Sequence, residues 1–267
     1  HEVIALDDKP WQSARLARVL TDSLAERPSL QRLMPIAGMV LTAFLARAGA
    51  VPADGRLPAL SLPDTQLDVA GPRPELLALA ETAAEMTASR AIHGATPLAR
   101  LHRLGATGPS FIAIHAVHLD GDDVDLLARH GGHVVHCPAS NMKLASGIAP
   151  VTALLAAGVN VALGSDGAAS NNRLDVFAEM RLASLLAKVA SDDAAAVPAA
   201  VALRMATLNG ARALGMDDRI GSLVPGKQAD LVAVDLAGIA TQPVFDPLSH
   251  LVFAAGRGCV TDVWIGG

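Results

Sequence analysis

Residues 111–136 read FIAIHAVHLDGDDVDLLARHGGHVVH, and this stretch contains a complete strand–helix–strand pattern. The runs Phe111–His115 and His133–His136 are apolar and of strand length, and a helix is predicted between them over residues 122–130. Continuous apolar strands that alternate with helices are typical of parallel strands covered by helices on both faces. The stretch therefore predicts an α/β fold built on a parallel sheet.

The same alternation continues toward the carboxyl terminus. The predicted elements are a helix over residues 148–157, a strand over 159–164, and helices over 174–190, 194–208 and 211–214. Two further segments, residues 229–235 and 260–264, have the composition of strands but lie beyond the last strand–helix unit. They predict a small separate sheet.

Residues 1–75 have a different composition from the rest of the chain. The predicted elements are two helices over residues 12–26 and 29–48, followed by a linker rich in Pro, Gly and Asp over residues 50–75. After His1 there is no histidine until His93. We interpret residues 1–75 as an atypical helical and linker segment, and we predict that any histidine-based site lies in the second part of the chain.

Composition excludes several classes of function. The net charge is −5, no run of Lys or Arg stands out, and aromatic residues make up 3% of the chain, so we predict no nucleic-acid partner. Cys137 and Cys259 cannot form a secreted-type disulfide framework, which makes the reducing cytoplasm the default location. The most apolar stretch, residues 33–48, is interrupted by Pro35 and Arg47 and is too short to cross a bilayer. We therefore predict no membrane partner.

Each predicted strand of the parallel sheet ends in a polar residue. His115 and His136 end the first two strands, and Asp166 follows the third in a turn rich in Gly and Ala. In a βα barrel the active site lies at the carboxyl ends of the strands. A carboxylate there can ligate a metal or act as a base. From these residues alone, a helix-capping aspartate and a hydrogen-bonded core histidine remain open alternatives.

Longer motifs are more specific than these single residues. The motifs are HAVH (115–118), HCPASNMKL (136–144), GSDGAASNN (164–172), MATLNGARAL (205–214), IGSLVPGKQADL (220–231) and FDPLSH (245–250). In this order, the stretch from about Glu81 to Trp264 closely resembles the amidohydrolase superfamily. The resemblance is to the branch that contains 5-methylthioadenosine/S-adenosylhomocysteine deaminases and the triazine and ethylammeline hydrolases.

The resemblance implies a domain arrangement. Residues 76–215 would supply the last four or so units of a (β/α)8 barrel of the TIM type, and residues 216–267 a remnant of a small β-sandwich domain. Residues 1–75 have no match in the family, and they are too short to supply four further units, because a whole barrel needs about 200 or more residues. Since the chain begins at His1 rather than Met and ends abruptly at Gly267, we expect a fragment of a longer gene product.

The resemblance also implies roles for single residues. Asp166 matches the aspartate that contacts the metal and takes a proton from the attacking water. Glu81 matches the glutamate that carries a proton to the ring nitrogen, and His115 the histidine that orients water and substrate. Ser170 matches a serine of the substrate pocket. His118 is a further candidate for that pocket, with a surface loop histidine as the alternative.

The implied reaction is attack of metal hydroxide on the carbon of a cyclic amidine, with loss of ammonia. The implied cofactor is a divalent ion, usually zinc, which lowers the pKa of bound water from about 15.7 to about 7. The implied substrate is a small amino-heterocycle, and a homo-oligomer remains open.

The chain departs from the family at its metal ligands. The family has a His-x-His pair on the first barrel strand, and no such pair precedes His115. It also has a metal-binding histidine three residues before the glutamate, where this chain has Ala78. Of the four ligands that the resemblance implies, only Asp166 remains, and one carboxylate does not make a tight zinc site. We therefore predict weak or no zinc binding and an inactive chain.

Three functions stay open on the sequence. The first is a deaminase of an adenosine derivative or a related amino-heterocycle. The second is a catalytically dead homologue or fragment with a binding or subunit role. The third is a chlorohydrolase on the same scaffold, with chloride rather than ammonia as the leaving group.

Overall fold

The structure, a computed structural model, describes residues 75–267. The two helices and the linker that were predicted within residues 1–75 lie outside the described residues, apart from Glu75, which begins the first strand. The described residues belong to one compact unit.

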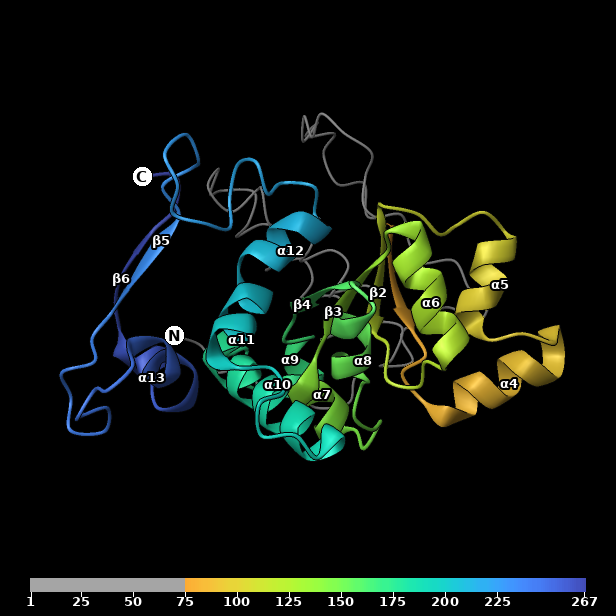
Figure 1. Ribbon diagram of the computed structural model, residues 1–267, viewed down its shortest axis with the longest axis horizontal. Helices are drawn as coiled ribbons and strands as arrows, with labels where there is room; N and C mark the ends of the chain where they lie inside the picture. The colour runs from red at the N-terminus through yellow and green to blue at the C-terminus, as the bar shows by residue number, and fades with distance from the viewer. Residues whose placement is uncertain (1–74) are drawn as a thin grey trace, which may run out of the picture. The chain divides into compact units, whose positions relative to one another are not determined.

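A four-stranded parallel sheet forms the centre of this unit (Figure 1). Its strands, in spatial and in chain order, are β1 (Glu75–Leu79), β2 (Phe111–His115), β3 (His133–His136) and β4 (Asn160–Leu163). The last three confirm the predicted parallel strands, with bounds equal or close to those expected. Neighbouring strands are joined by helical crossovers, which is the arrangement of the βα units in a barrel.

Helices follow each strand. They are α4 (Ala83–His93) and α5 (Pro97–Arg103) after β1, α6 (Gly121–His130) after β2, α7 (Pro138–Lys143) and α8 (Val151–Ala156) after β3, and α9 (Ala168–Asn171), α10 (Val176–Ser191), α11 (Ala199–Ala206) and α12 (Leu208–Ala213) after β4.

The bounds of α6 follow from its sequence. Asp120 caps its first turn by accepting a hydrogen bond from the Asp123 amide, and Gly131 ends the helix at φ 69°. A glycine is favoured in this left-handed position because it has no Cβ to clash.

Helix α11 begins later than predicted, at Ala199 instead of residue 194. Residues before it form a turn, and Pro198 occupies the N-cap position of the helix without a side-chain capping hydrogen bond. A proline is tolerated at a helix start because its missing N–H would have no partner there. The helix therefore begins directly after Pro198.

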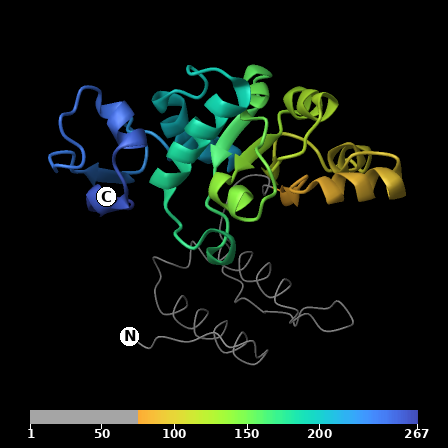
Figure 2. The same ribbon diagram turned by 90° about the horizontal axis from the view of Figure 1, so that it is seen from below.

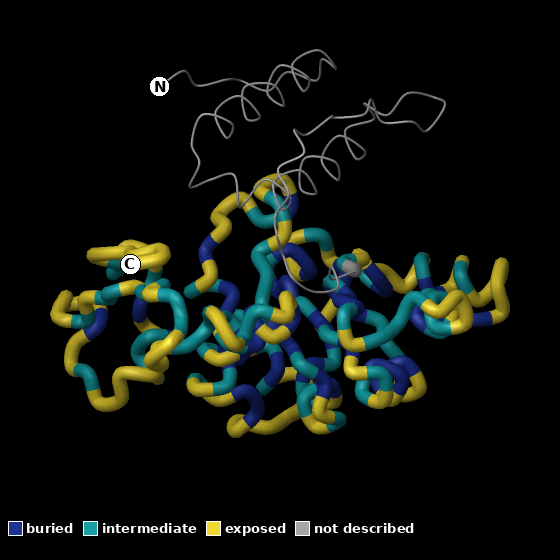
Figure 3. The backbone as a smooth tube through the Cα atoms, turned by 90° about the horizontal axis from the view of Figure 1, so that it is seen from above, coloured by how far each residue is buried: buried dark blue, intermediate teal, exposed yellow. Residues whose placement is uncertain are grey.

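The core lies where the sheet meets its helices. Phe111 and Val134 of the sheet, Leu154 of α8 and Met205 of α11 are almost fully buried. Figure 3 shows this buried region at the centre of the unit, whereas the segment after residue 216 is mostly exposed or half-buried. Burial on both faces explains why the strands read as continuous apolar runs.

The carboxyl-terminal segment contains a two-stranded antiparallel sheet, β5 (Leu231–Val234) with β6 (Val260–Trp264), as predicted. Between them lie α13 (Pro247–Phe253) and a 3-10 turn, η1 (Arg257–Cys259), which the sequence pattern did not predict. Helix α13 packs beside α10 and α11 (Figure 2), and the Arg181 guanidinium donates to the carbonyls of Val252 and Ala255 at 3.2 and 2.6 Å. The assignment of this segment to a β-sandwich, and the boundaries at residues 76 and 216, stay predictions.

Candidate active site

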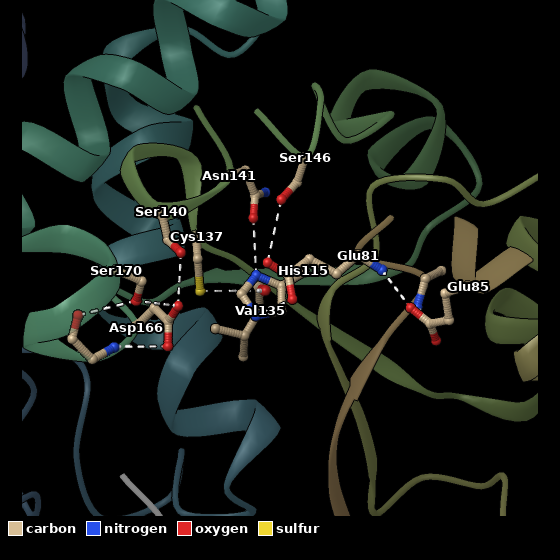
Figure 4. A network of polar contacts seen from close by, with 12 residues as sticks. Glu81, Glu85, His115, Val135, Cys137, Ser140, Asn141, Ser146, Asp166 and Ser170 are labelled. Carbon is tan, nitrogen blue, oxygen red and sulfur yellow. Dashed lines mark hydrogen bonds and ion pairs between the residues drawn. The ribbon is translucent and has the colours of Figure 1, made fainter. Parts of the chain in front are cut away.

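The carboxyl ends of the parallel strands bring three of the predicted site residues together (Figure 4). Glu81 follows β1, His115 ends β2, and Asp166 follows β4. The pairing register aligns these ends, with Leu79 opposite His115 and His136 opposite Leu163. The strand pattern of the sequence therefore predicted which edge of the sheet carries the polar side chains.

His115 is fixed in a buried position. Its side chain is almost inaccessible, and its Nδ1 lies 2.9 Å from Oδ1 of Asn141. Its backbone has φ 73°, a left-handed conformation that costs a β-carbon-bearing residue about 1–2 kcal/mol. The amides of Ala116, Val117 and His118 offset this cost by donating to carbonyls at the end of β1. The turn after β2 is thus held against β1.

Glu81 lies beside the His115 ring. Its Oε2 is 3.9 Å from His115 Nε2, and its Oε1 accepts a hydrogen bond of 3.2 Å from the Ser146 hydroxyl. The Glu85 carboxylate accepts from the amides of Ala80 and Glu81, both at 3.0 Å. Glu85 was not singled out from the sequence, although Thr82-x-x-Glu85 is a capping-box signature that signals it.

Asp166 sits in a cradle of hydrogen-bond donors. Its Oδ2 accepts from the hydroxyls of Ser140 at 2.7 Å and Ser170 at 2.5 Å, and its Oδ1 accepts from the Gly167 amide at 2.7 Å. Burial alone would raise the pKa of Asp166, but these donors, together with His115, outweigh it and hold the pKa below its ordinary value. Asp166 is therefore ionised at neutral pH.

Ser170 was predicted from the resemblance, and the structure places it on α9, buried against Asp166. Ser140 was not predicted as a site residue. Its hydroxyl comes from α7, which follows β3, and nothing in the HCPASNMKL motif signals that it reaches a carboxylate 26 residues away.

Glu179 supports the two serines that donate to Asp166, through contacts with the residues next to them. It is 1% exposed, and its two carboxylate oxygens accept from the Ala139 amide at 3.1 Å and from the Asn171 side-chain amide at 2.6 Å. Burial raises the pKa of Glu179 in spite of these two hydrogen bonds. Because Ala139 precedes Ser140 and Asn171 follows Ser170, Glu179 ties together the two helices that hold Asp166.

His118 does not point freely into the site. Its Nε2 lies 2.7 Å from the Ser146 carbonyl, so the ring braces the loop whose hydroxyl contacts Glu81. Its role as a substrate contact stays a prediction.

His136 ends β3 and is 1% exposed, with no hydrogen-bond partner for either ring nitrogen within the described residues. Burial, together with nearby His115, lowers the pKa of His136 to about 4, so the ring is neutral at pH 7. The adjacent Cys137 is equally buried, and burial raises the pKa of its thiol. A thiol held protonated in this way is a poor nucleophile.

The described residues do not fit a zinc ion by themselves. Zinc in proteins takes three or four protein ligands. Across residues 75–267, no group of three or more His, Cys, Asp or Glu side chains is placed to hold a metal. Ala78, which pairs with Ile114 in the sheet, presents only a methyl group. Asp166 is the single predicted ligand in this part of the chain.

Comparison with known proteins identifies the family. The model of the Amidohydrolase family matches residues 76–267. This chain belongs to the amidohydrolase family. Within this family it is similar to a 5-methylthioadenosine/S-adenosylhomocysteine deaminase of Teredinibacter turnerae, with 49% identity over 189 residues, which cover 71% of the chain and 43% of the relative. The deaminase of that name from Syntrophobacter fumaroxidans is 53% identical over 182 residues, covering 68% of the chain and 42% of the relative.

Solved structures of family members support the same family assignment. An adenosine deaminase from Xanthomonas campestris with bound zinc superposes with a TM-score of 0.72 at 55% identity, over 73% of this chain and 44% of that one. A mutant atrazine chlorohydrolase from Arthrobacter aurescens, complexed with zinc and atraton, gives 0.69 at 27% identity, over 73% and 43%. These matches confirm the resemblance seen in the sequence. The chain spans about two fifths of the length of these relatives.

None of the described helices is long and apolar enough to cross a membrane.

Proposed function

We propose that this chain is the carboxyl-terminal part of a hydrolytic deaminase of adenosine-type heterocycles, and that it is inactive as it stands. The observation that carries the proposal is the grouping of Glu81, His115 and Asp166 at one edge of the sheet. Relatives named as deaminases of methylthioadenosine, S-adenosylhomocysteine and adenosine, at about 50% identity, support the choice of substrate class.

The three residues suit the proton transfers of such a reaction. Water adds to the amidine carbon and loses one proton, and the ring nitrogen gains one. The added hydroxyl then gives up its remaining proton, the amino group gains this proton and leaves as ammonia, and the carbon becomes a carbonyl. Asp166 is ionised and accepts the proton of the attacking water. Glu81, oriented by Ser146, carries a proton to the ring nitrogen, and His115 orients the water between them.

Inactivity of the chain follows from the absence of metal-binding histidines in its sequence. A cyclic amidine needs a strong nucleophile at neutral pH, and water activated only by a carboxylate with a lowered pKa is a weak one. The sequence has no His-x-His pair before His115, and position 78 is alanine. Because these ligands are missing, we propose that the chain alone does not carry out the reaction.

Ammonia release tests the proposal. The purified chain, with added zinc, should release no ammonia from 5-methylthioadenosine, S-adenosylhomocysteine or adenosine, and Ala78→His alone should not rescue it. A chimera with Ala78→His, in which the amino-terminal half of the Teredinibacter turnerae relative replaces residues 1–74, should be active. Its matched control carries Asp166→Ala in addition and should lose that activity.

Two outcomes would overturn the proposal. One is ammonia release by the unmodified chain that disappears in Asp166→Ala. The other is a chimera that folds and binds zinc but releases no ammonia.

A chlorohydrolase is the second candidate, because the atrazine chlorohydrolase shares the fold over the described residues. Its identity to this chain is 27%, against 55% for the adenosine deaminase. Incubation of the same chimera with a chlorinated triazine separates the two, since chloride rather than ammonia would be released.

A further inference from the structure

We infer that Asn141 is a positioning residue that fixes the tautomer of His115 and thereby leaves the ring nitrogen that faces Glu81 unprotonated. The tautomer is a property of this chain without any ligand. Its catalytic consequence rests on the proposed function.

The inference starts from one buried hydrogen bond. His115 Nδ1 lies 2.9 Å from the Oδ1 atom of Asn141. Both residues are buried, with 4% of the surface of His115 and 1% of that of Asn141 exposed. An amide oxygen can only accept a hydrogen bond, so Nδ1 must carry the proton. In the neutral ring, Nε2 then keeps its lone pair, and this nitrogen is the one that faces Glu81 Oε2 at 3.9 Å.

Asn141 is held from both sides along the chain. Its amide donates to the Cys137 carbonyl at 3.0 Å, and its carbonyl accepts from the Ser146 amide at 2.8 Å. Figure 4 shows its side chain directed at the His115 ring from helix α7, which follows the neighbouring strand β3. Helix α7 therefore orients the histidine at the end of β2, and the loop that follows α7 carries the Ser146 hydroxyl to Glu81.

The nitrogen end of the Asn141 side-chain amide indicates why an asparagine occupies this position. The reason is the contact with His115 rather than packing. Its Nδ2 is buried without a partner among residues 75–267. A buried donor left unpaired costs about 1–3 kcal/mol, so an apolar side chain of similar size would be the more stable choice here. Within the described part of the chain the oxygen is the only paired end of the amide, and its partner is His115.

The fixed tautomer matters for Glu81. If Nε2 carried the proton, its N–H would face Glu81 Oε2 at 3.9 Å and attract that carboxylate. With the lone pair on Nε2, His115 instead accepts a hydrogen bond from water, and Glu81 stays free to carry a proton. Asn141 thus acts on the reaction only through His115.

The experiment is a long-range ¹H–¹⁵N correlation spectrum of the metal-free chain with ¹⁵N-labelled histidine. His115→Gln assigns the His115 signals. Asn141→Asp keeps an acceptor at the ring, whereas Asn141→Leu removes it. Asn209→Leu is the matched control, because Asn209 is also buried but donates to the Val161 carbonyl, away from His115.

We expect His115 to show a protonated Nδ1 and an unprotonated Nε2 in the unmodified chain, in Asn141→Asp and in Asn209→Leu. In Asn141→Leu the single tautomer should be lost, and the two ring nitrogens should give averaged shifts. A proton on Nε2 in the unmodified chain, or no change in Asn141→Leu, would overturn the inference. Should Asn141→Leu fail to fold, the unmodified chain and Asn141→Asp decide, since both must carry the proton on Nδ1. A chimera that is inactive although His115 carries its proton on Nδ1 would contradict the proposed function but not this inference.

Discussion

The two sides of the candidate site differ in how completely their polar groups are paired. On one side, the Asp166 carboxylate receives three hydrogen bonds, and Glu179 beneath it receives two. On the other side, His136 has no partner for either ring nitrogen, and one end of Asn141 is unpaired within the described residues. Buried polar groups are normally paired. The chain therefore preorganises the Asp166 side by itself and leaves the histidine side incomplete.

The largest effect is expected beneath Asp166. Glu179→Ala leaves the Ala139 amide and the Asn171 side chain without their partner and opens a cavity, so we expect a loss of about 3 kcal/mol in the free energy of unfolding. His136→Leu, on the unpaired side, removes two unsatisfied nitrogens and should be neutral or stabilising. Urea unfolding of both variants measures the difference. Equal losses in the two variants would break the comparison.

A smaller effect is expected for the hydroxyls of the cradle. Ser140→Ala or Ser170→Ala removes one donor to Asp166 and should cost about 1–2 kcal/mol. Each change should also raise the pKa of Asp166 toward its ordinary value, because a donor to the charged form is lost. Ser165→Ala is the control, since its hydroxyl contacts the Asp166 backbone carbonyl and not the carboxylate. Carboxyl ¹³C titration follows the pKa, and a shift equal in all three variants would contradict the cradle.

The smallest effect is the response of stability to pH. Burial raises the pKa of Asp123, although Thr96 donates to its Oδ1 at 2.6 Å. Its Oδ2 has no hydrogen-bond partner among residues 75–267. The folded chain therefore keeps a proton on Asp123 after the unfolded chain has lost it, and this contribution to stability declines as pH rises above about 3.8. Asp166, with a lowered pKa, contributes stability that is present above about 3.8 and is lost below it.

Two variants separate these opposite slopes. Asp123→Asn should remove a fall in stability with rising pH above 3.8, and Asp166→Asn should remove a rise in stability with pH below it. Thermal unfolding between pH 3 and 6 is the measurement. Slopes of the same sign for both residues would show that one of the two environments has been misjudged.

The sequence predicted the sheet better than the contacts within the site. Strands β2 and β3 were predicted with their observed bounds, because strands buried on both faces read as continuous apolar runs. Strand β1 was not predicted, since ELLAL consists of residues that favour helices, and pairing with β2 overrides that preference. Helix α13 was missed although Asp246 and Pro247 mark its start as cap and first residue.

Within the site, the sequence located the strand-end residues His115 and Asp166 but not the groups that hold them. Asn141 and Ser140 each lie 26 residues from their partners, and Glu179 is 40 residues from Ala139. Such contacts depend on how crossover helices pack on the sheet. No local pattern in the chain encodes them.

We propose that this chain carries the proton-transfer residues of its family without the ligands of a metal site. Calorimetric titration of the purified chain with zinc tests this most directly, with Asp166→Ala as the control. We predict no stoichiometric binding and no difference between the two proteins, because Asp166 is the single predicted ligand within residues 75–267 and no group of metal-binding side chains surrounds it. A stoichiometric site of sub-micromolar affinity that disappears in Asp166→Ala would contradict the account.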